Sequence, residues 1–324
     1  MEMMGFLISH KNNERRRALL PADLDKIANV GCLLFEKGYG ESVGHSDEEY
    51  VAKGAKIGTR EDVLKCKLIV DVKLGDADYL DELDDGKTLI GWAHTVQKTD
   101  FTETMLRHNH TILAWEEIFE DGRYIFYRNR EVAGEAAIIQ AYRYCGKMPY
   151  DTKVAIIGNG QTVKGALRIL HGLGAEVDVF GRKLEKLFKK KMFDYDVIVN
   201  CVMWDTSRTD HLVTAEDVAK MKSGTMIIDV SCDPHLGIET SHETTIADPI
   251  YIIDGVIHYA VDNTPAMYPI TVTKVLSEGF APYVDKIIEN NYPESLENAV
   301  VIRDGHIIDQ RIREFREARG LYCR

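Results

Sequence analysis

Ionisable side chains follow three of the short apolar runs in this sequence. Lys73 and His94 each end such a run in the first half of the chain, and Asp233 comes directly after a third run. Apolar runs of this length are typical of buried strands, and open α/β sheets bind ligands outside the carboxyl ends of their strands. A single lysine or histidine in such a place is usually an ordinary loop residue, but three together favour a site where chemistry occurs.

The types of these residues suit proton transfer next to an anion. A histidine titrates near neutral pH, so His94 is the best candidate for a general acid/base. Lys73 can donate to a carbonyl oxygen or to a carboxylate. Arg16, in the loop after the first expected strand, offers a planar guanidinium that suits a carboxylate. Arg15 and Arg17 have the same chemistry, so the choice among the three arginines stays open on physical grounds.

A glycine-rich segment lies near the middle of the chain. The residues Gly158-Asn159-Gly160-Gln161-Thr162-Val163 follow an apolar run and open an amphipathic stretch. Glycines there let the backbone turn tightly and approach a pyrophosphate at a helix N-terminus. Val163 stands where a third glycine is usual, although Gly165 and Ala166 could allow close helix packing. Because strand, loop, helix and next strand all have suitable lengths, we expect a dinucleotide site rather than a merely tight turn.

The end of the next strand indicates which dinucleotide would bind. Gly181 follows the expected strand 176–180, where an NAD enzyme usually has an acidic residue that binds the ribose 2′-hydroxyl. Without that carboxylate nothing repels a 2′-phosphate, and Arg182 and Lys183 can bind one. Asp178 lies in the middle of the strand rather than at its end. The alternative is a pair of ordinary basic loop residues, and we predict an NADP(H) site.

Short apolar runs alternate with amphipathic stretches along most of the chain, which predicts an α/β protein of two Rossmann-like, doubly wound parallel-sheet domains with a cleft between them. Helices are expected to open at Pro21 and Thr59 and to cover residues 163–173 and 271–290. The expected strands are 5–8, 32–36, 68–73, 88–93, 111–115, 153–157, 176–180, 197–202, 226–230, 251–253 and 256–260.

The order of these elements predicts a discontinuous first domain. The helix 271–290 could return the chain to the first half, so we expect residues 1–130 and 280–324 to form a substrate-binding, catalytic domain. Residues 131–279 would form the dinucleotide-binding domain. The charged tail 304–320 is interpreted as a solvated helix.

Composition excludes several other kinds of protein. The 324 residues carry 40 basic and 52 acidic side chains, and a net charge of −12 disfavours a nucleic-acid partner. We expect no membrane partner and a cytoplasmic location, because no long apolar run exists and residues 1–8 are too short for a secretory signal. The six cysteines lie far apart, which indicates reduced thiols, mostly structural, and no metal site.

Longer segments resemble one family. Its N-terminal signature is similar to the run from Lys11 to Pro21, and its later signature resembles Gly237-Ile238-Glu239-Thr240-Ser241. Further matching segments are 38–40, 46–50, 254–259 and 263–265. On these segments the chain is similar to the alanine dehydrogenase and transhydrogenase family from its N-terminus to about Glu278.

The resemblance implies roles for the residues named above. Arg16 and Lys73 would bind the carboxylate and the oxo or imino group of a pyruvate-like substrate, and His94 would be the acid/base. Asp233 would lie beside the nicotinamide, although it could equally offset the positive charge of an iminium and orient an amine.

Departures from alanine dehydrogenase indicate a particular branch. The chain is shorter, Gly181 replaces the acidic residue, Trp92 precedes His94, and residues 202–211 differ. These features resemble the carboxyethylornithine synthases, NADPH-dependent enzymes that join pyruvate to the side-chain amine of ornithine or lysine to give N(5)-(L-1-carboxyethyl)-L-ornithine or its lysine counterpart. Candidates for binding the distal amino-acid group of the amine substrate are Arg128, Arg130, Trp204, Asp205 and Arg208.

Three alternatives stay open beside this hypothesis. Alanine dehydrogenase would use ammonia in place of the amino-acid amine, and a saccharopine-type dehydrogenase would use a similar lysine and histidine pair. A noncatalytic NADP(H)-binding protein is disfavoured because Arg16, Lys73, His94 and Asp233 are all present together. We expect the protein to be a homo-oligomer that acts on small molecules.

Overall fold

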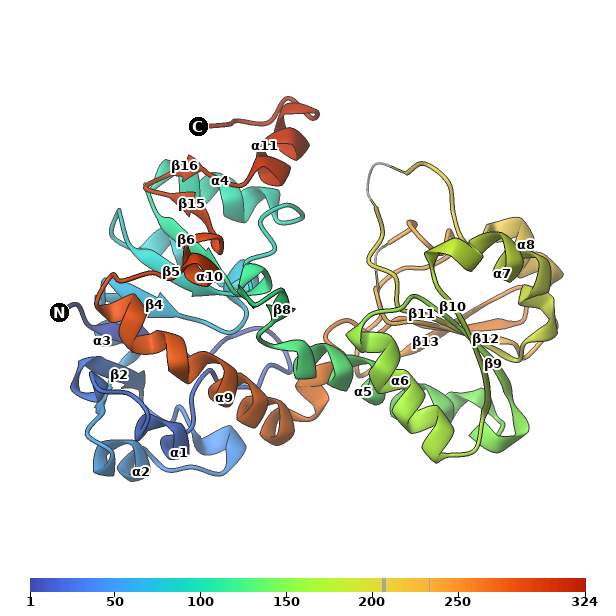
Figure 1. Ribbon diagram of the computed structural model, residues 1–324, viewed down its shortest axis with the longest axis horizontal. Helices are drawn as coiled ribbons and strands as arrows, with labels where there is room; N and C mark the ends of the chain where they lie inside the picture. Colours follow the sequence, from blue (N-terminus) through green and yellow to red (C-terminus); the bar gives the residue numbers. More distant parts are fainter. Residues whose placement is uncertain (206–207, 233) are drawn as a thin grey trace. The chain divides into compact units, whose positions relative to one another are not determined.

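The computed structural model describes residues 1–205, 208–232 and 234–324. The chain divides into two α/β units, each built around its own mostly parallel sheet (Figure 1). Unit 1 comprises Met1–Phe126 and Tyr268–Arg324, and unit 2 comprises Tyr127–Met267.

The sheet of unit 1 has the strand order β16-β15-β6-β5-β4-β1-β2-β3 among the described residues. Strands β1 to β6 run parallel, whereas β15 is antiparallel to β6 and β16 is antiparallel to β15. The strand order changes direction between β4 and β1, and doubly wound sheets bind ligands at such a switch point. The strands are β1 (Met4–Phe6), β2 (Leu33–Glu36), β3 (Lys56–Gly58), β4 (Leu68–Val70), β5 (Thr88–Gly91), β6 (Thr111–Ala114), β15 (Val300–Arg303) and β16 (His306–Ile307).

Helices and a small hairpin complete unit 1. The hairpin pairs β7 (Phe119–Glu120) with β8 (Arg123–Tyr124). The helices are α1 (Pro21–Leu24), α2 (Asp47–Ala52), α3 (Arg60–Leu64), α4 (Thr99–Arg107), α9 (Pro269–Ile288), α10 (Glu294–Glu297) and α11 (Gln310–Glu317).

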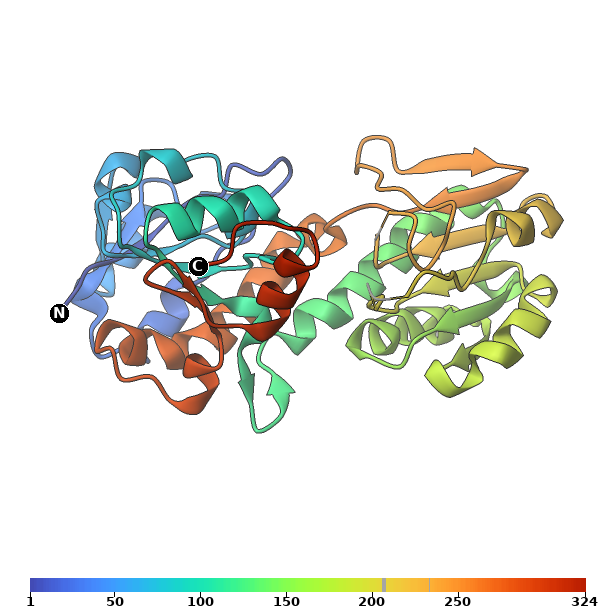
Figure 2. The same cartoon turned by 90° about the horizontal axis from the view of Figure 1, so that it is seen from above.

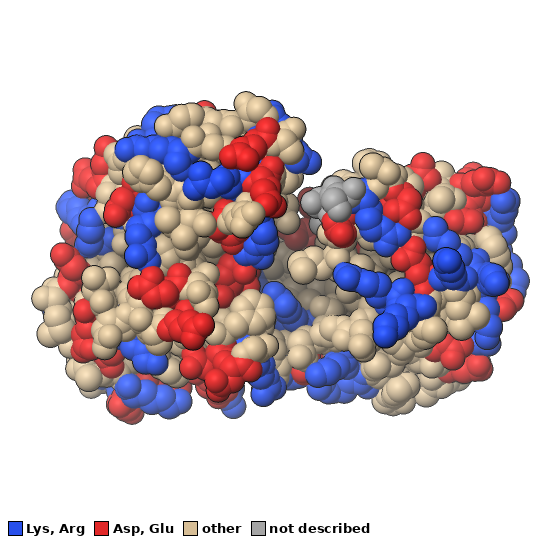
Figure 3. Space-filling model, turned by 45° about the horizontal axis from the view of Figure 1, so that its top comes forward, with Lys and Arg blue, Asp and Glu red and all other residues tan. Residues whose placement is uncertain are grey.

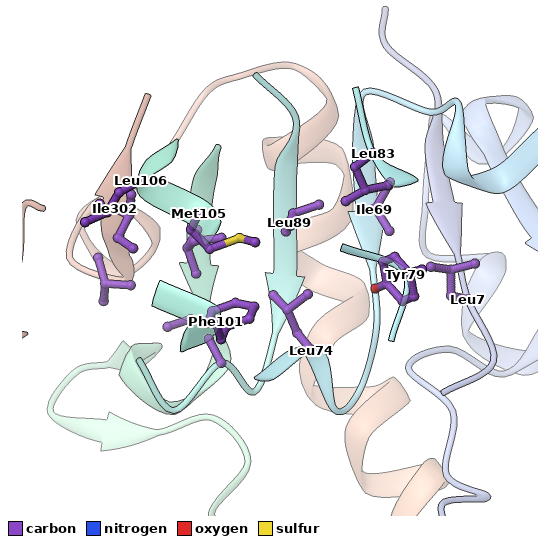
Figure 4. Packing of buried hydrophobic residues seen from close by; sticks show 14 of the residues in the cluster. Leu7, Ile69, Leu74, Tyr79, Leu83, Leu89, Phe101, Met105, Leu106 and Ile302 are labelled. Atoms are coloured by element: carbon purple, nitrogen blue, oxygen red, sulfur yellow. The ribbon is translucent and has the colours of Figure 1, made fainter. Parts of the chain in front are cut away.

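One face of this sheet is covered by α4. Figure 4 shows Phe101, Met105 and Leu106 of this helix beside Leu89 and Ile302 of the sheet, and all five side chains are buried. Their spacing places the three helix residues on a single face, as expected for an amphipathic helix over a sheet. The packing holds the loop between β5 and α4, which contains His94, against the end of the sheet.

Unit 2 has the strand order β10-β9-β11-β12-β14-β13 within the residues that are described. Only the pairing of β13 with β14 is antiparallel among these, and both strands lie at one edge of the sheet (Figure 2). The strands are β9 (Lys153–Ile157), β10 (Glu176–Phe180), β11 (Val197–Asn200), β12 (Met226–Asp229), β13 (Ile250–Ile253) and β14 (Val256–Tyr259), and the helices are α5 (Tyr127–Cys145), α6 (Gln161–Gly172), α7 (Glu185–Lys191) and α8 (Ala215–Lys220).

Two glycines let α5 and α6 pack closely. A Cβ atom on Gly165 would lie 1.8 Å from the carbonyl oxygen of Glu131, and one on Gly134 would lie 2.1 Å from that of Thr162. Only glycine fits at such an approach of two backbones. Gly165 therefore serves close helix packing, as the sequence suggested, and the packing partner is α5.

The structure corrects two expectations about the end of the chain. The boundary expected near residue 280 lies at residue 268, because the whole of α9 belongs to unit 1. The tail 304–320 is a helix only in part, because α11 is mostly exposed as expected, whereas the residues before it belong to a hairpin. The run Val300-Val301-Ile302 is a buried strand, and Asp304-Gly305 is the turn of a hairpin with positive φ at both residues. In α11, Arg316 is buried and donates to the carbonyl oxygens of Thr99 and Tyr322.

Charged side chains of both signs are intermixed over the viewed face of each unit (Figure 3). All six cysteines belong to the described residues and are free thiols, but Cys32 and Cys201 are only partly buried. In the part of the chain that the structure describes, no helix has the length and apolar character needed to cross a bilayer.

Candidate functional site

The carboxyl ends of four adjacent strands of unit 1 bring three expected residues, and one that was not expected, Glu116, to one edge of the sheet. Arg16 lies in the segment after β1, Lys73 follows β4, His94 follows β5, and Glu116 follows β6. The strands are shorter than expected, because β4 ends at Val70 and β5 ends at Gly91. Lys73 and His94 therefore lie in turns beyond the strands rather than at their last residues.

The turns after β4 and β5 are tied to each other. The buried carboxylate of Asp71 accepts from the backbone N–H of Lys73 at 2.9 Å and from the hydroxyl of Tyr79 at 3.2 Å. The backbone N–H of Gly75 donates to the carbonyl oxygen of Trp92 at 2.9 Å. A Cβ atom on Gly91 would lie 1.8 Å from the carbonyl oxygen of Asp71, so the approach of the two turns requires glycine there. Burial raises the pKa of Asp71 to about 6.

Lys73 is buried and faces a carboxylate. Its Nζ lies 3.6 Å from Asp76, which also binds Lys98 at 2.6 Å and Lys11 at 3.2 Å. Burial alone would raise the pKa of Asp76, but the hydrogen bond from Lys98 and the charges of Lys73 and Lys11 hold it well below its ordinary value. Three ammonium groups around one carboxylate leave a surplus of positive charge, which suits an anionic substrate.

His94 is positioned through its backbone. It adopts a left-handed conformation with φ of +49°, and its N–H donates to Glu116 Oε1 at 2.6 Å. The N–H of Ala93 donates to the other oxygen of the same carboxylate at 3.2 Å. Burial raises the pKa of Glu116, and these two hydrogen bonds oppose that effect. Glu116 thus fixes the turn that carries the imidazole.

The structure distinguishes among the three arginines. Arg16 is buried, is bound by Glu14 through Nε at 2.8 Å and Nη2 at 2.5 Å, and lies 4.9 Å from the ring of Trp92. Trp92 in turn donates to the hydroxyl of Tyr124 at 2.9 Å. Arg17 donates to backbone carbonyls and Arg15 is exposed. Of the three, Arg16 contacts the turn that leads to His94.

The glycine-rich loop of unit 2 has the geometry of a phosphate-binding turn. Gly158 has φ of +125°, and a Cβ atom there would lie 3.1 Å from the carbonyl oxygen of Cys201. Gly160 has open space where a side chain would be, and it immediately precedes α6. Because neither glycine has a side chain, the backbone before this helix N-terminus can approach the pyrophosphate of a dinucleotide closely.

The end of β10 lies beside this loop. Gly181 occupies the position of the usual ribose-binding carboxylate. The nearest atom to a Cβ placed on Gly181 would be the Cβ of Asn159 at 3.9 Å, so no other side chain fills this position. Arg182 and Lys183 follow in an exposed turn. Asp178 lies in the middle of β10 and accepts a hydrogen bond from the hydroxyl of Tyr195 at 2.6 Å. These residues fit a 2′-phosphorylated ribose.

A polar network that the sequence analysis missed joins the ends of β11 and β12. Asn200 donates to Asp229 at 2.9 Å, and Ser241 donates to the same buried carboxylate at 2.5 Å. Burial raises the pKa of Asp229 against these hydrogen bonds. Asn200 and Asp229 each end an apolar run, the same signal that selected Lys73. Asp233 lies outside the described residues.

The candidates for binding the distal group of the amine belong to unit 2. Arg128 forms ion pairs with Glu131 and Glu135, and Arg208 binds Glu185 and Asp210 and lies 4.3 Å from the ring of Trp204. Arg128 and Arg130 are in α5, whereas Trp204, Asp205 and Arg208 follow β11.

A glycine-rich βαβ unit in one sheet, together with cationic and imidazole side chains at the edge of another, defines an α/β protein of the two-domain dehydrogenase class. The alanine dehydrogenase/PNT N-terminal domain matches residues 9–126, and the corresponding C-terminal domain matches residues 182–312. The chain therefore belongs to the alanine dehydrogenase/PNT family, a family of oxidoreductases.

Individual relatives agree with this assignment. An N(5)-(carboxyethyl)ornithine synthase of Clostridium botulinum is 32% identical over 87% of this chain and 93% of its own length. An alanine dehydrogenase of Halomonas elongata is 28% identical over 88% of this chain and 87% of its own length. A solved L-alanine dehydrogenase has the same fold, with a TM-score of 0.83 at 22% identity over 97% of this chain and 98% of that one.

Proposed function

We propose that this protein reduces the imine of pyruvate and the side-chain amine of ornithine, or of lysine, with NADPH. Pyruvate, the amine, NADPH and a proton give the N-(1-carboxyethyl) amino acid, NADP⁺ and water. The carbonyl oxygen leaves as water, a carbon–nitrogen bond forms, and the hydride goes to the former carbonyl carbon. The product from ornithine is N(5)-(L-1-carboxyethyl)-L-ornithine.

The observation that carries the proposal is the 32% identity to a named carboxyethylornithine synthase over nearly its whole length. Alanine dehydrogenases are less similar, at 28%. The open position at Gly181 and the exposed cations that follow it support the same branch and NADPH as the cofactor.

The residues of unit 1 would hold and protonate the substrate. Arg16 and Lys73 would bind the carboxylate and the carbonyl oxygen of pyruvate, because both are cations at the same sheet edge. His94 would accept a proton from the attacking ammonium and donate one to the departing oxygen. Asp233 would offset the charge of the iminium. Bound NADPH supplies the hydride, and the protein supplies position.

The preferred amine substrate distinguishes this activity from that of an alanine dehydrogenase. We expect NADPH oxidation with pyruvate and ornithine or lysine to exceed greatly the oxidation with pyruvate and ammonia. The measurement is initial NADPH oxidation against a panel of ammonia, ornithine, lysine and no amine. Faster turnover with ammonia would assign the chain to alanine dehydrogenase activity instead.

The cofactor preference has its own test. The double variant Gly181→Asp with Arg182→Gln should bind NADPH about 10-fold or more weakly, since it adds a repulsive carboxylate and removes a charge-assisted hydrogen bond. Arg143→Gln, at an exposed arginine of α5, is the matched control and should leave NADPH binding unchanged. Fluorescence titration with NADPH and NADH measures both. Tighter binding of NADH by the unaltered protein would contradict the prediction.

A further inference from the structure

A cavity opens beside the proposed pyruvate site in unit 1. Its volume is about 450 Å³, which falls in the range of small-molecule sites. The turn that follows Lys73, residues 75–81, forms one wall, and the turn that follows His94 together with the start of α4, residues 97–104, forms the other. The cavity therefore lies between the two loops that carry the lysine and the histidine.

One side chain connects this cavity to the proposed reaction site. Asp76 lines the cavity, and its Oδ2 atom lies 3.6 Å from the Nζ of Lys73. Its Oδ1 atom lies 2.6 Å from the Nζ of Lys98, which also lines the cavity. A substrate whose reacting end reaches Lys73 could place its remainder in this cavity, on the other side of the same carboxylate.

The charges on the walls match a zwitterion. Lys98 directly precedes α4, and the N-terminus of that nine-residue helix adds partial positive charge, so this end suits a carboxylate. Asp81 stands on the opposite wall and suits an ammonium group, whereas Asp78 on the same wall already pairs with His10 and Arg60. Asp100 also lines the cavity, so the lining carries carboxylates as well as the Lys98 ammonium.

We infer that this cavity binds the α-amino and α-carboxylate groups of the diamino acid, with the carboxylate at Lys98 and the ammonium at Asp81. The inference rests on the proposed function and deepens it by assigning the specificity site of the second substrate. Ammonia needs no such site, so binding of the diamino acid in the cavity would distinguish a condensing enzyme from an alanine dehydrogenase.

The test removes one group of the substrate at a time. Putrescine lacks the carboxylate of ornithine, and 5-aminopentanoate lacks its α-amine. In NADPH oxidation with saturating pyruvate, Lys98→Met should raise KM about 10-fold or more for ornithine and 5-aminopentanoate and leave KM for putrescine unchanged. Asp81→Asn should raise KM for ornithine and putrescine and leave 5-aminopentanoate unchanged. Lys98→Arg should restore most of the ornithine affinity.

Two controls exclude indirect effects. Lys98 also binds Asp76, and a disturbance passed on to Lys73 would reduce turnover with every amine, putrescine included. Lys65→Met and Glu103→Gln change charge at exposed positions of unit 1 outside the cavity and should alter no KM. Equal changes for all amines, or none, would overturn the inference while leaving the condensing activity in place. Absence of ornithine-dependent oxidation by the unaltered enzyme would overturn the proposed function and, with it, the assignment of the cavity.

Discussion

The imidazole of His94 is carried by a turn whose two backbone N–H groups are held by one carboxylate, that of Glu116. Because the backbone fixes the turn, replacing the side chain should remove proton transfer without collapsing the loop. We predict that His94→Ala lowers kcat with pyruvate and ornithine by about 10²- to 10⁴-fold and leaves NADPH affinity nearly unchanged.

Turnover per folded molecule and NADPH titration measure this prediction together. The control variant is His108→Ala. His108 is a half-buried histidine at the end of α4 that pairs with Asp85, so this variant also removes an imidazole from unit 1. Retention of more than about a tenth of the activity by His94→Ala would argue against proton transfer by this residue.

Asp71 makes unit 1 sensitive to pH. Burial raises its pKa from 3.8 to about 6, so the folded state holds a proton that the unfolded chain has released between these values. The contribution of Asp71 to the free energy of unfolding is therefore fully present at low pH and is lost as pH rises from about 4 to about 6. Relative to Asp71→Asn, the unaltered protein should lose about 2 to 3 kcal/mol over that interval.

Urea denaturation of both proteins at pH 4, 5, 6 and 7, followed by tryptophan fluorescence, measures the difference. Trp92 and Trp115 report on unit 1. Effects of other titrating groups cancel between the two proteins. A difference that is constant with pH, or that grows in the opposite direction, would show that Asp71 is ionised throughout.

Some residues of the candidate site could be predicted from the sequence, whereas their partners could not. Lys73 and His94 could be selected because each directly follows an apolar run, a signal that is local in the chain. The partners Asp76 and Glu116 could not, because an acidic residue in a loop has no distinctive pattern until the fold brings a lysine or a turn against it. Arg16 was distinguished from its neighbours only by the family resemblance, and the physical reason for that choice, its contact with Trp92, needed the structure.

At the scale of elements, the contact of α5 with α6 depends on Gly165. We predict that Gly165→Ala destabilises the protein by about 2 to 3 kcal/mol, because the new methyl group would force the backbones apart. Gly172 lies in the same helix with nothing within 4 Å of its Cβ position, so Gly172→Ala should stabilise by about 0.5 to 1 kcal/mol. Urea denaturation of the two variants measures both values, and equal effects would contradict the prediction.

Strands were easier to predict than helices and ends. The runs 153–157 and 176–180 coincide with β9 and β10. β9 is buried and apolar after its first residue, as expected of a central parallel strand, whereas β10 at the sheet edge alternates exposed acidic residues with apolar ones. The helix α5 was not predicted, because it has small and charged residues, Arg128 and Glu131 among them, where an amphipathic helix has an apolar stripe. The strand β15 was not predicted, because its short run Val300-Val301-Ile302 finds its partner only across the chain in β6.

At the scale of the molecule, the two units have separate hydrophobic cores. We predict that Val301→Asp, which buries a carboxylate in the core of unit 1, costs about 4 kcal/mol or more there and leaves NADPH binding by unit 2 in place. Ile308→Asp, at an exposed position of the same segment, should do neither. Near-ultraviolet circular dichroism and NADPH titration measure the two properties, and loss of both in Val301→Asp would show that the units fold as one.

The connectivity of unit 1 has a consequence for the growing polypeptide. Unit 2 is continuous from residue 127 to residue 267, so it can fold as soon as that stretch has left the ribosome. The sheet of unit 1 cannot be completed then, because β15, which pairs with β6, begins only at Val300. Throughout the synthesis of unit 2, the nascent chain therefore has β6 as an open strand edge, the form in which a half-built sheet is most prone to pair with a neighbouring chain.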